Sequence, residues 1–549
     1  MTAVLDRPAP SAPAGAVPRF RFEPPAVLPW LIVAAAFVTG LLLTDTSAVH
    51  ILVYAVYLAL GVVLPGTLVH RAVRGSRGNL AEDLGLGAAT GLLVQLTGWA
   101  IAAAAGLQQV LWCWPLLVLV AFAAVPALRR HWRVTDPKPL PVLWHWAIGG
   151  GLLIVVLWGA WIWSTNETPP ATASYYQDLM YHLALVHEMT RSMPFEVPQL
   201  AGDALRYHYL SDADMAAASM ITGIPAELVL LRLWMVPIGA IAVLVVAALA
   251  RDVSGRWWAG PLAGTTAFIG LPLTLGSPVD ANGGQALSFA SPSQSYAMPL
   301  LALLTLVTVD LLRGRKLGAA WFLVPALALA CAGAKSSALP PLIAGIALAG
   351  VVLWIRDRAF PRAVAGLLVA VGIPMLIGTR LFAGGGAGTL GIEFFGLLRW
   401  IEPYQVTVGE GDKVLSAPIV PPGLDGAGAP AWAYVLGIVL WWMVLQAPRL
   451  LGLAGLGTRH LRADPAAWLL GGMIAAGAGA AWVFFHPSAS QLYFFQCAVP
   501  FGVVLTTWLL AEKVRRWWVP VAGLVAGAAW NFFAPEIADP ADRESWTAW

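Results

Sequence analysis

The stretch "LWHWAIGGGLLIVVLWGAWIW", residues 143–163, contains no Asp, Glu, Lys or Arg. It is long enough to cross a bilayer as a helix, which takes about 20 residues. Windows of this kind recur along the chain of 549 residues, of which 59% are hydrophobic and 11% charged. Soluble domains carry about 25% charged residues, so lipid must solvate much of this apolar surface. The sequence therefore predicts an all-α, polytopic transmembrane helix bundle, with the lipid bilayer as a partner.

The apolar windows number fifteen, and we expect about 13–15 of them to span the membrane. Several are short enough to be re-entrant, and Gly and Pro are tolerated inside such helices. The windows are 28–44, 49–69, 84–105, 109–127, 143–163, 225–250, 257–275, 293–312, 318–333, 339–355, 364–381, 431–447, 466–485, 492–511 and 517–533.

The positions of the charged residues predict how the chain is oriented. If the N-terminus is cytoplasmic, 24 of the 32 basic residues lie in the N-terminal tail and in cytoplasmic loops, while 19 of the 29 acidic residues lie on the other side. Loop Lys and Arg are retained on the cytoplasmic face, so this asymmetry favours that orientation. The bias towards Ala, Gly, Pro, Arg and Trp is typical of GC-rich bacterial genomes. We therefore expect a multi-pass protein of the bacterial plasma membrane.

The three cysteines, Cys113, Cys331 and Cys497, lie in apolar runs and suggest neither a disulfide framework nor a zinc site.

The map of spans and loops divides the chain into seven parts. The parts are a disordered cytoplasmic tail (1–27), N-terminal spans (28–163), a long extracytoplasmic loop (164–224), central spans (225–381), a second extracytoplasmic loop (382–430), C-terminal spans (431–533) and an extracytoplasmic tail (534–549).

The long loop contains "SYYQDLMYHLALVHEMTRSMP", residues 174–194, an unusually polar stretch for this chain. A helix over residues 178–191 would place Asp178 and His182, at positions i and i+4, on one face. Its amphipathic pattern suits an interfacial helix lying in the plane of the membrane surface. The dipeptide Met193-Pro194 should end this helix. Such a helix is either merely solvated, with an Asp–His contact, or carries an acid/base or metal-binding pair.

A second polar cluster in the same loop contains Arg206, Tyr207 and His208. One interpretation is a polar loop whose tyrosines anchor it at the membrane interface. The other is a binding site, in which Arg206 and His208 meet an anionic headgroup and the tyrosine rings line a sugar or lipid.

Two further candidates lie in later segments. "CAGAKSSALPP", residues 331–341, places Lys335 between two apolar spans, and with the serines after it the segment is similar to a phosphate-holding turn. The alternative is that Lys335 extends to the outer headgroups. In "HPSASQLYFFQ", residues 486–496, His486 is either a substrate-binding residue or a helix-end residue that faces water.

The segment "YYQDLMYHLALVHEMTRSMPFEVPQLAGDALRYHYL", residues 175–210, resembles the first large extracytoplasmic loop of GT-C-type polytopic membrane glycosyltransferases, in particular a poorly characterised branch. In that family the loop usually follows the first span, whereas here five predicted spans precede it. The matching positions are Asp178, Tyr181, His182, Pro194, Pro198, Gly202, Leu205, Tyr207, His208 and Tyr209.

This resemblance implies a GT-C-like fold and a polyprenyl-phosphate-linked sugar as donor, with Asp178 as catalytic base. His182 would orient it or bind a metal such as Mg²⁺ or Mn²⁺, while Arg206, Tyr207, His208, Lys335 and His486 would bind the donor phosphate and substrate. The expected function is an inverting transfer of the sugar to a cell-envelope glycan, lipid or protein at the outer face.

Two other functions remain open from the sequence. They are a transporter or flippase for a lipid-linked or anionic solute and a ligase or polymerase of an envelope polymer. Neither a Walker-type nor a Rossmann glycine motif is present, so cytosolic nucleotide chemistry is not expected. We expect no nucleic-acid partner.

Overall fold

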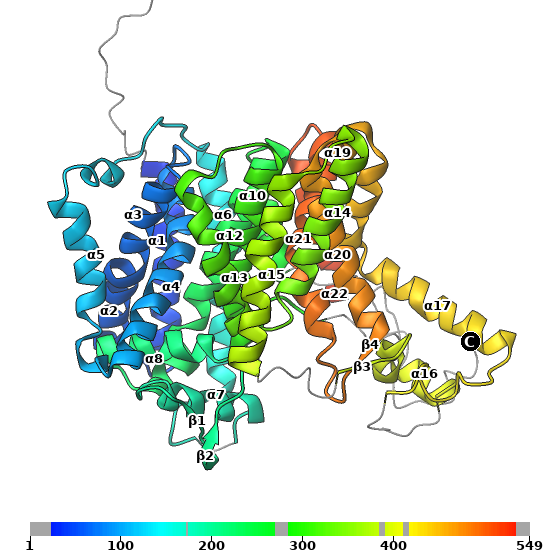
Figure 1. Cartoon of the computed structure of the whole chain (residues 1–549), viewed down its shortest axis with the longest axis horizontal. Coiled ribbons are helices and arrows are strands. Elements are labelled where there is room, and N and C mark those ends of the chain that lie inside the picture. The colour runs from blue at the N-terminus through cyan, green and yellow to red at the C-terminus, as the bar shows by residue number, and fades with distance from the viewer. Residues whose placement is uncertain (1–23, 172–173, 270–283, 384–389, 410–416, 534–549) are drawn as a thin grey trace, which may run out of the picture.

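A computed structural model of the chain describes residues 24–171, 174–269, 284–383, 390–409 and 417–533. The tail predicted at 534–549 and most of the tail predicted at 1–27 lie outside the described residues, as do 270–283 within the central part and 384–389 and 410–416 within the second extracytoplasmic loop. Nearly all of the described secondary structure is helical, which confirms the all-α polytopic bundle (Figure 1).

Ten helical segments are long and apolar enough to cross a membrane. They are α1 (Pro24–Leu42), the continuous run of α2 (Ala48–Tyr57), η1 (Leu58–Val63) and α3 (Leu64–Val73), α4 (Leu80–Ala105), α6 (Val142–Thr165), α10 (Met235–Ser254), α12 (Pro292–Leu312), α14 (Leu339–Asp357), α15 (Arg362–Ala383), α20 (Pro465–Val483) and α21 (Leu492–Lys513).

The other five predicted windows also coincide with apolar helices, but these are short, broken or incompletely described. They are α5 (Cys113–Ala124), α11 (Ala259–Ile269), η5 with α13 (Gly318–Phe322, Leu323–Ala334), α17 (Ala429–Leu445) and α22 (Trp518–Phe533). After α17 the chain bends by 72° into α18 (Ala447–Leu450) and η7 (Leu451–Gly457). The described residues thus give ten full-length spans, or eleven with the bent pair, rather than 13–15.

Short elements connect these helices. They are η2 (Gln108–Val110), η3 (Arg129–Trp132), α7 (Gln177–Glu188), β1 (Glu196–Val197), β2 (Leu200–Ala204), α8 (Leu210–Thr222), α9 (Ala226–Leu228), η4 (Val229–Leu233), β3 (Gly391–Ile392), η6 (Gly396–Trp400), α16 (Glu402–Thr407), α19 (Arg459–Ala463) and β4 (Phe484–Phe485). Strands β1 and β2 form an antiparallel hairpin, and β3 pairs antiparallel with β4.

Local sequence explains where several helices begin and end. The side chain of Asn79 accepts a hydrogen bond from the backbone N–H of Glu82 and so caps α4, whose first turn is acidic as the helix dipole favours. Gly106 follows α4 with φ +68°, a left-handed conformation that glycine adopts without strain. Asp464 caps α20 in the same way as Asn79 caps α4, and Pro465 occupies the first helical position.

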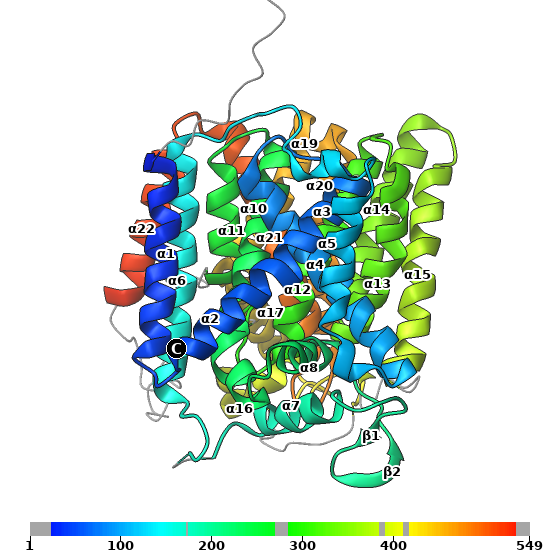
Figure 2. The same cartoon turned by 90° about the vertical axis from the view of Figure 1, so that its left-hand side faces the viewer.

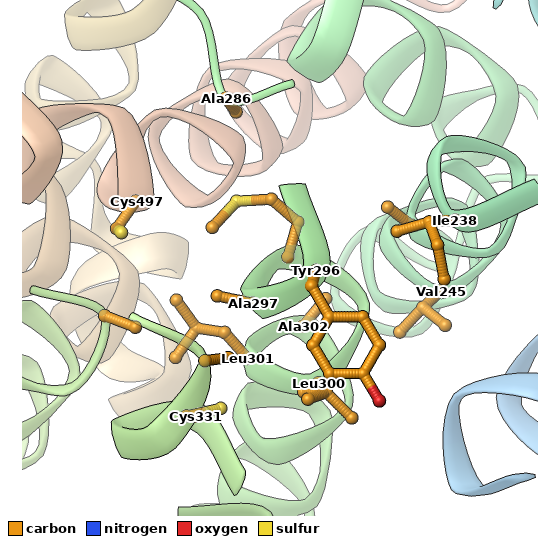
Figure 3. Packing of buried hydrophobic residues seen from close by; sticks show 14 of the residues in the cluster. Ile238, Val245, Ala286, Tyr296, Ala297, Leu300, Leu301, Ala302, Cys331 and Cys497 are labelled. Atoms are coloured by element: carbon orange, nitrogen blue, oxygen red, sulfur yellow. The ribbon is translucent and has the colours of Figure 1, made fainter. Parts of the chain in front are cut away.

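Helix α12 lies at the centre of the bundle, and nearly all of it is buried. Figure 3 shows Tyr296, Leu300 and Leu301 of α12 among side chains of α10, α13 and α21. Where helices approach closely, small residues make room: a Cβ added to Gly472 of α20 would lie 2.7 Å from the Cα of Gly345 in α14.

The bundle has two unlike ends. At one end lie α7, α8, the β1–β2 hairpin and α16, and we call this the loop end (Figures 1 and 2). The opposite end holds arginines from several connections, and we call it the arginine-rich end. Its members include Arg71, Arg74, Arg77, Arg251, Arg313 and Arg315, all of which are paired with carboxylates.

Candidate functional site

Helix α7 places the first candidate residues at the loop end. It covers residues 177–188, close to the predicted 178–191, and stops well before Pro194. Leu185 and Met189, which the helical spacing puts on the same face as His182, are buried, whereas His187 is exposed. His182 therefore points into the protein, and Asp178 lies half-buried one turn earlier on the same face.

His182 is held by a carboxylate from the neighbouring helix. Its Nδ1 lies 2.8 Å from Oδ1 of Asp212, in the first turn of α8, and both side chains are buried. Burial raises the pKa of Asp212, although the imidazole opposes this effect. A base hydrogen-bonded to a buried carboxylate is the arrangement that fixes a ring for acid/base chemistry. Asp212 was not among the predicted site residues, because its distance of thirty positions from His182 gives no local signal.

Tyr207 and His208 lie in the connection before α8 and pack against α7. Their rings stack with centroids 4.1 Å apart, and Tyr207 meets Tyr181 edge to face at 5.2 Å. The Nε2 atom of His208 is buried and has no hydrogen-bond partner among the described residues. Burial, together with the positive charge of neighbouring Lys335, lowers the pKa of His208 well below its usual value, so its ring is neutral at physiological pH.

Lys335 lies in the turn between α13 and α14 and is only 6% exposed. Its Nζ sits 3.6 Å from the centre of the Tyr493 ring and 3.4 Å from each of the hydroxyls of Ser291 and Ser293. Three helices therefore meet at this ammonium: the end of α13 and the first turns of α12 and α21.

No carboxylate of the described residues lies within 4.0 Å of this ammonium, since Lys335 takes part in none of the ion pairs found there. Burial lowers the pKa of Lys335 to about 8, and the negative charge of Asp178 acts in the opposite direction. A buried cation without an anionic partner is costly, and in a membrane protein such a residue is a candidate functional site.

The structure brings Asp178, His182, Tyr207, His208 and Lys335 together. Asp178 is near enough for its charge to act on both Lys335 and Tyr207, and His208 lies beside both Lys335 and His182. The two remaining predicted residues are placed differently. Arg206 is exposed and pairs with no carboxylate of the described residues, and His486 belongs to a turn in which its Nδ1 accepts a hydrogen bond from the backbone of Ser488.

Ser291, Ser293 and Tyr493 complete the surroundings of Lys335 but were not predicted. The serines belong to the polar, serine-rich sequence "SFASPSQSY", residues 288–296. The signal in the sequence was Pro292, which starts a helix and so fixes the hydroxyls on either side of it at a helix N-terminus.

Within the described ranges, no group of three or more His, Cys, Asp or Glu side chains is arranged to hold a metal ion. A divalent cation therefore stays a prediction from the family resemblance. No protein-family model, no curated protein sequence and no solved structure matches this chain.

Proposed function

We propose that this protein is a membrane glycosyltransferase. It transfers a sugar from a polyprenyl-phosphate-linked donor to an acceptor of the cell envelope, at the outer face of the bacterial plasma membrane. The observation that carries the proposal is the buried ammonium of Lys335, which has hydroxyl and aromatic neighbours but no carboxylate within 4.0 Å among the described residues.

The surroundings of Lys335 match the needs of a phosphate leaving group. An ammonium and two serine hydroxyls donate hydrogen bonds, and charge-assisted donors are the strong partners of phosphate oxygens. As the bond between the sugar and the phosphate breaks, negative charge grows on the departing oxygen, and a fixed cation in a water-poor site stabilises that charge.

Asp178 supports the other half of the reaction. Its carboxylate would take the proton of the acceptor hydroxyl while the acceptor oxygen forms a bond with the anomeric carbon of the sugar. The carbon–oxygen bond to the phosphate breaks at the same time, and its electron pair stays on the phosphate. The base and the phosphate-binding cation must lie on opposite sides of that carbon, and the proximity of Asp178 to Lys335 suits this arrangement.

The proposed orientation rests on the charges of the loops. The arginine-rich end would face the cytoplasm because basic loops are retained there, and the loop end with Asp178 and Lys335 would then face outward. A donor already activated on a lipid needs no nucleotide at that face.

Replacing Asp178 by Asn tests the proposal. We expect the variant, reconstituted in liposomes with a panel of labelled undecaprenyl-phosphate sugars and an extract of envelope acceptors, to lose transfer by about 10²–10⁴-fold, the contribution of a general base. Asp203→Asn, in the exposed β1–β2 hairpin, is the matched control and should keep its activity. Normal turnover by a folded Asp178→Asn protein would refute the assignment.

A transporter or flippase for an anionic lipid is the second candidate, because the unpaired Lys335 would serve a translocated anion equally well. The same liposomes separate the two functions. A transporter moves labelled undecaprenyl phosphate between leaflets without forming a glycosidic bond, and Asp178→Asn need not impair it. An envelope-polymer ligase or polymerase would instead transfer a preassembled chain rather than one sugar.

A further inference from the structure

The proposed function leaves open what kind of molecule accepts the sugar, and the face of α7 beside Asp178 bears on that question. The nature of the acceptor rests on the proposed function, because only a sugar transferase needs one. The residues concerned are Asp178, His182 and Asp212, together with the rings of Tyr181 and Tyr207.

Asp212 determines what His182 can bind. A carboxylate only accepts hydrogen bonds, so the Nδ1 atom, 2.8 Å from Asp212, carries the ring proton. The Nε2 atom of the neutral ring is then an acceptor, and it makes no hydrogen bond to any residue that the structure describes. His182 thus presents one fixed hydrogen-bond acceptor from a buried and rigidly held ring.

Asp178 presents a second acceptor beside the first. The two residues are four positions apart on α7, and side chains at that spacing have their Cβ atoms about 5–6 Å apart on one helix face. Two hydrogen-bond acceptors with no donor between them are complementary to two hydroxyl groups on neighbouring carbon atoms of a substrate. A substrate with a single hydroxyl would leave one of these two hydrogen-bond acceptors unpaired, which is unfavourable.

Aromatic rings border the same face. Tyr207 lies edge-on to His182 with ring centroids 5.9 Å apart and meets Tyr181 at 5.2 Å. Binding sites for small molecules combine such apolar rings with a few fixed polar groups. The C–H face of a sugar ring packs on aromatic rings while its hydroxyls turn to the polar groups.

We propose that the acceptor is a glycan with two adjacent hydroxyl groups, one of which reacts at Asp178 while the other is held by Nε2 of His182. The reacting hydroxyl gives its proton to the Asp178 carboxylate and its oxygen to the new glycosidic bond. The second hydroxyl donates a hydrogen bond to His182 and leaves unchanged. Asp212 is a positioning residue, since it acts only through the imidazole.

Deoxygenated acceptors test this directly with the unmodified full-length protein. Liposomes containing the protein receive labelled undecaprenyl-phosphate sugars and one of three acceptors: an octyl glycoside, a Ser/Thr peptide or a long-chain alcohol. We expect label on the octyl glycoside, and a fall of about tenfold or more in kcat/KM when the hydroxyl next to the reacting one is removed, because a site built to bind a hydroxyl rejects the analogue that lacks it.

His182→Asn supplies the matching change in the protein. Asn keeps an amide near the Nδ1 position, towards Asp212, but has no atom at the Nε2 position. The acceptor KM should rise about tenfold, with no further loss for the deoxygenated acceptor, because both changes remove the same hydrogen bond. Glu188→Gln is the control for disturbing a buried polar group of α7, since among the described residues Glu188 bonds only to the Glu196 backbone and to exposed Arg191.

Transfer to the peptide or the alcohol but not to the glycoside would overturn the inference while leaving the proposed function in place. So would a change of less than twofold on deoxygenation. Absence of transfer by the folded wild-type protein from every donor to every acceptor would instead overturn the proposed function, and the inference with it.

Discussion

The two ends of the bundle differ in how their charges are satisfied. At the arginine-rich end, buried carboxylates are paired with arginines from other segments: Asp310 of α12 lies 2.6 Å from Arg74 and 2.6 Å from Arg315, and Arg313 lies 2.7 Å from Asp464. At the loop end, Lys335 is as deeply buried but has only hydroxyls and a ring within reach in the described residues.

We interpret the paired charges as stabilising the fold and the Lys335 ammonium as serving function. The ion pairs connect α3, α10, α12 and α20 and so fix helices that are distant in sequence. In these pairs each charge already has a partner of opposite sign. The ammonium at the loop end has an incomplete environment, which a phosphate group would complete. We therefore assign the paired buried charges to the scaffold, and we propose that Lys335, which has no carboxylate partner among the described residues, belongs to the site.

Breaking a pair at the arginine-rich end should have the largest effect on stability. In Asp310→Asn, Arg74 loses the one carboxylate it pairs with among the described residues, while Arg77 and Arg315 keep only Asp252. We expect unfolding to become easier by about 3–5 kcal/mol, the usual cost of breaking a buried ion pair.

Buried cysteines report the unfolding. Cys331 and Cys497 are fully buried, so a thiol-reactive dye labels them only as the protein opens on heating, best measured in a Cys113→Ala background. Asp357→Asn is the control, because its ion pair with Arg356 is exposed and should matter little. Equal melting temperatures of Asp310→Asn and Asp357→Asn would contradict the claim that the buried ion pairs of the arginine-rich end stabilise the scaffold.

Removing the charge of Lys335 at the loop end should increase stability and reduce function. We expect Lys335→Met to lower transfer by about 10²-fold, as when one donor to a developing anion is removed. The same variant should melt at higher temperature, by a free energy on the order of 3 kcal/mol, since the pKa of Lys335 falls from 10.5 to about 8 on burial.

Arg206→Ala serves as the matched control in that experiment, because Arg206 is an exposed cation of the same end and should change neither quantity. A Lys335→Met protein that is destabilised like Asp310→Asn would show that Lys335 belongs to the scaffold.

A smaller effect is expected from pH alone. Since the pKa of Lys335 is about 8, its charge is present below pH 8, and transfer should fall by about tenfold for each pH unit above it. Stability should move the other way. Folding lowers this pKa from 10.5, so the cost of burying the charge is full below pH 8 and disappears as the pH rises from 8 towards 10.5. The melting-temperature gap between wild type and Lys335→Met should close over that range.

The sequence predicts the helices of this protein well, because the apolar windows of membrane helices are long and local. All fifteen windows coincide with helices, and the polar stretch at residues 174–194 contains the helix α7. It predicts their lengths less well: the 72° bend after α17 lies beside Pro448, a helix-breaking residue that a search for apolar windows alone does not take into account. Likewise Lys335 could be selected as a costly residue in an apolar chain, and His182 by its i, i+4 spacing from Asp178. Asp212 and Ser291 could not be selected, because only the fold brings them to these partners.

Binding of a lipid phosphate to purified protein tests the central claim most directly. The melting temperature of the full-length protein in detergent is measured with increasing undecaprenyl phosphate, and with undecaprenol as the uncharged control. We expect undecaprenyl phosphate to stabilise the wild type in a concentration-dependent way, and to leave Lys335→Met unchanged. Equal stabilisation of both proteins, or of the wild type by undecaprenol, would contradict the claim that the unpaired Lys335 binds the phosphate.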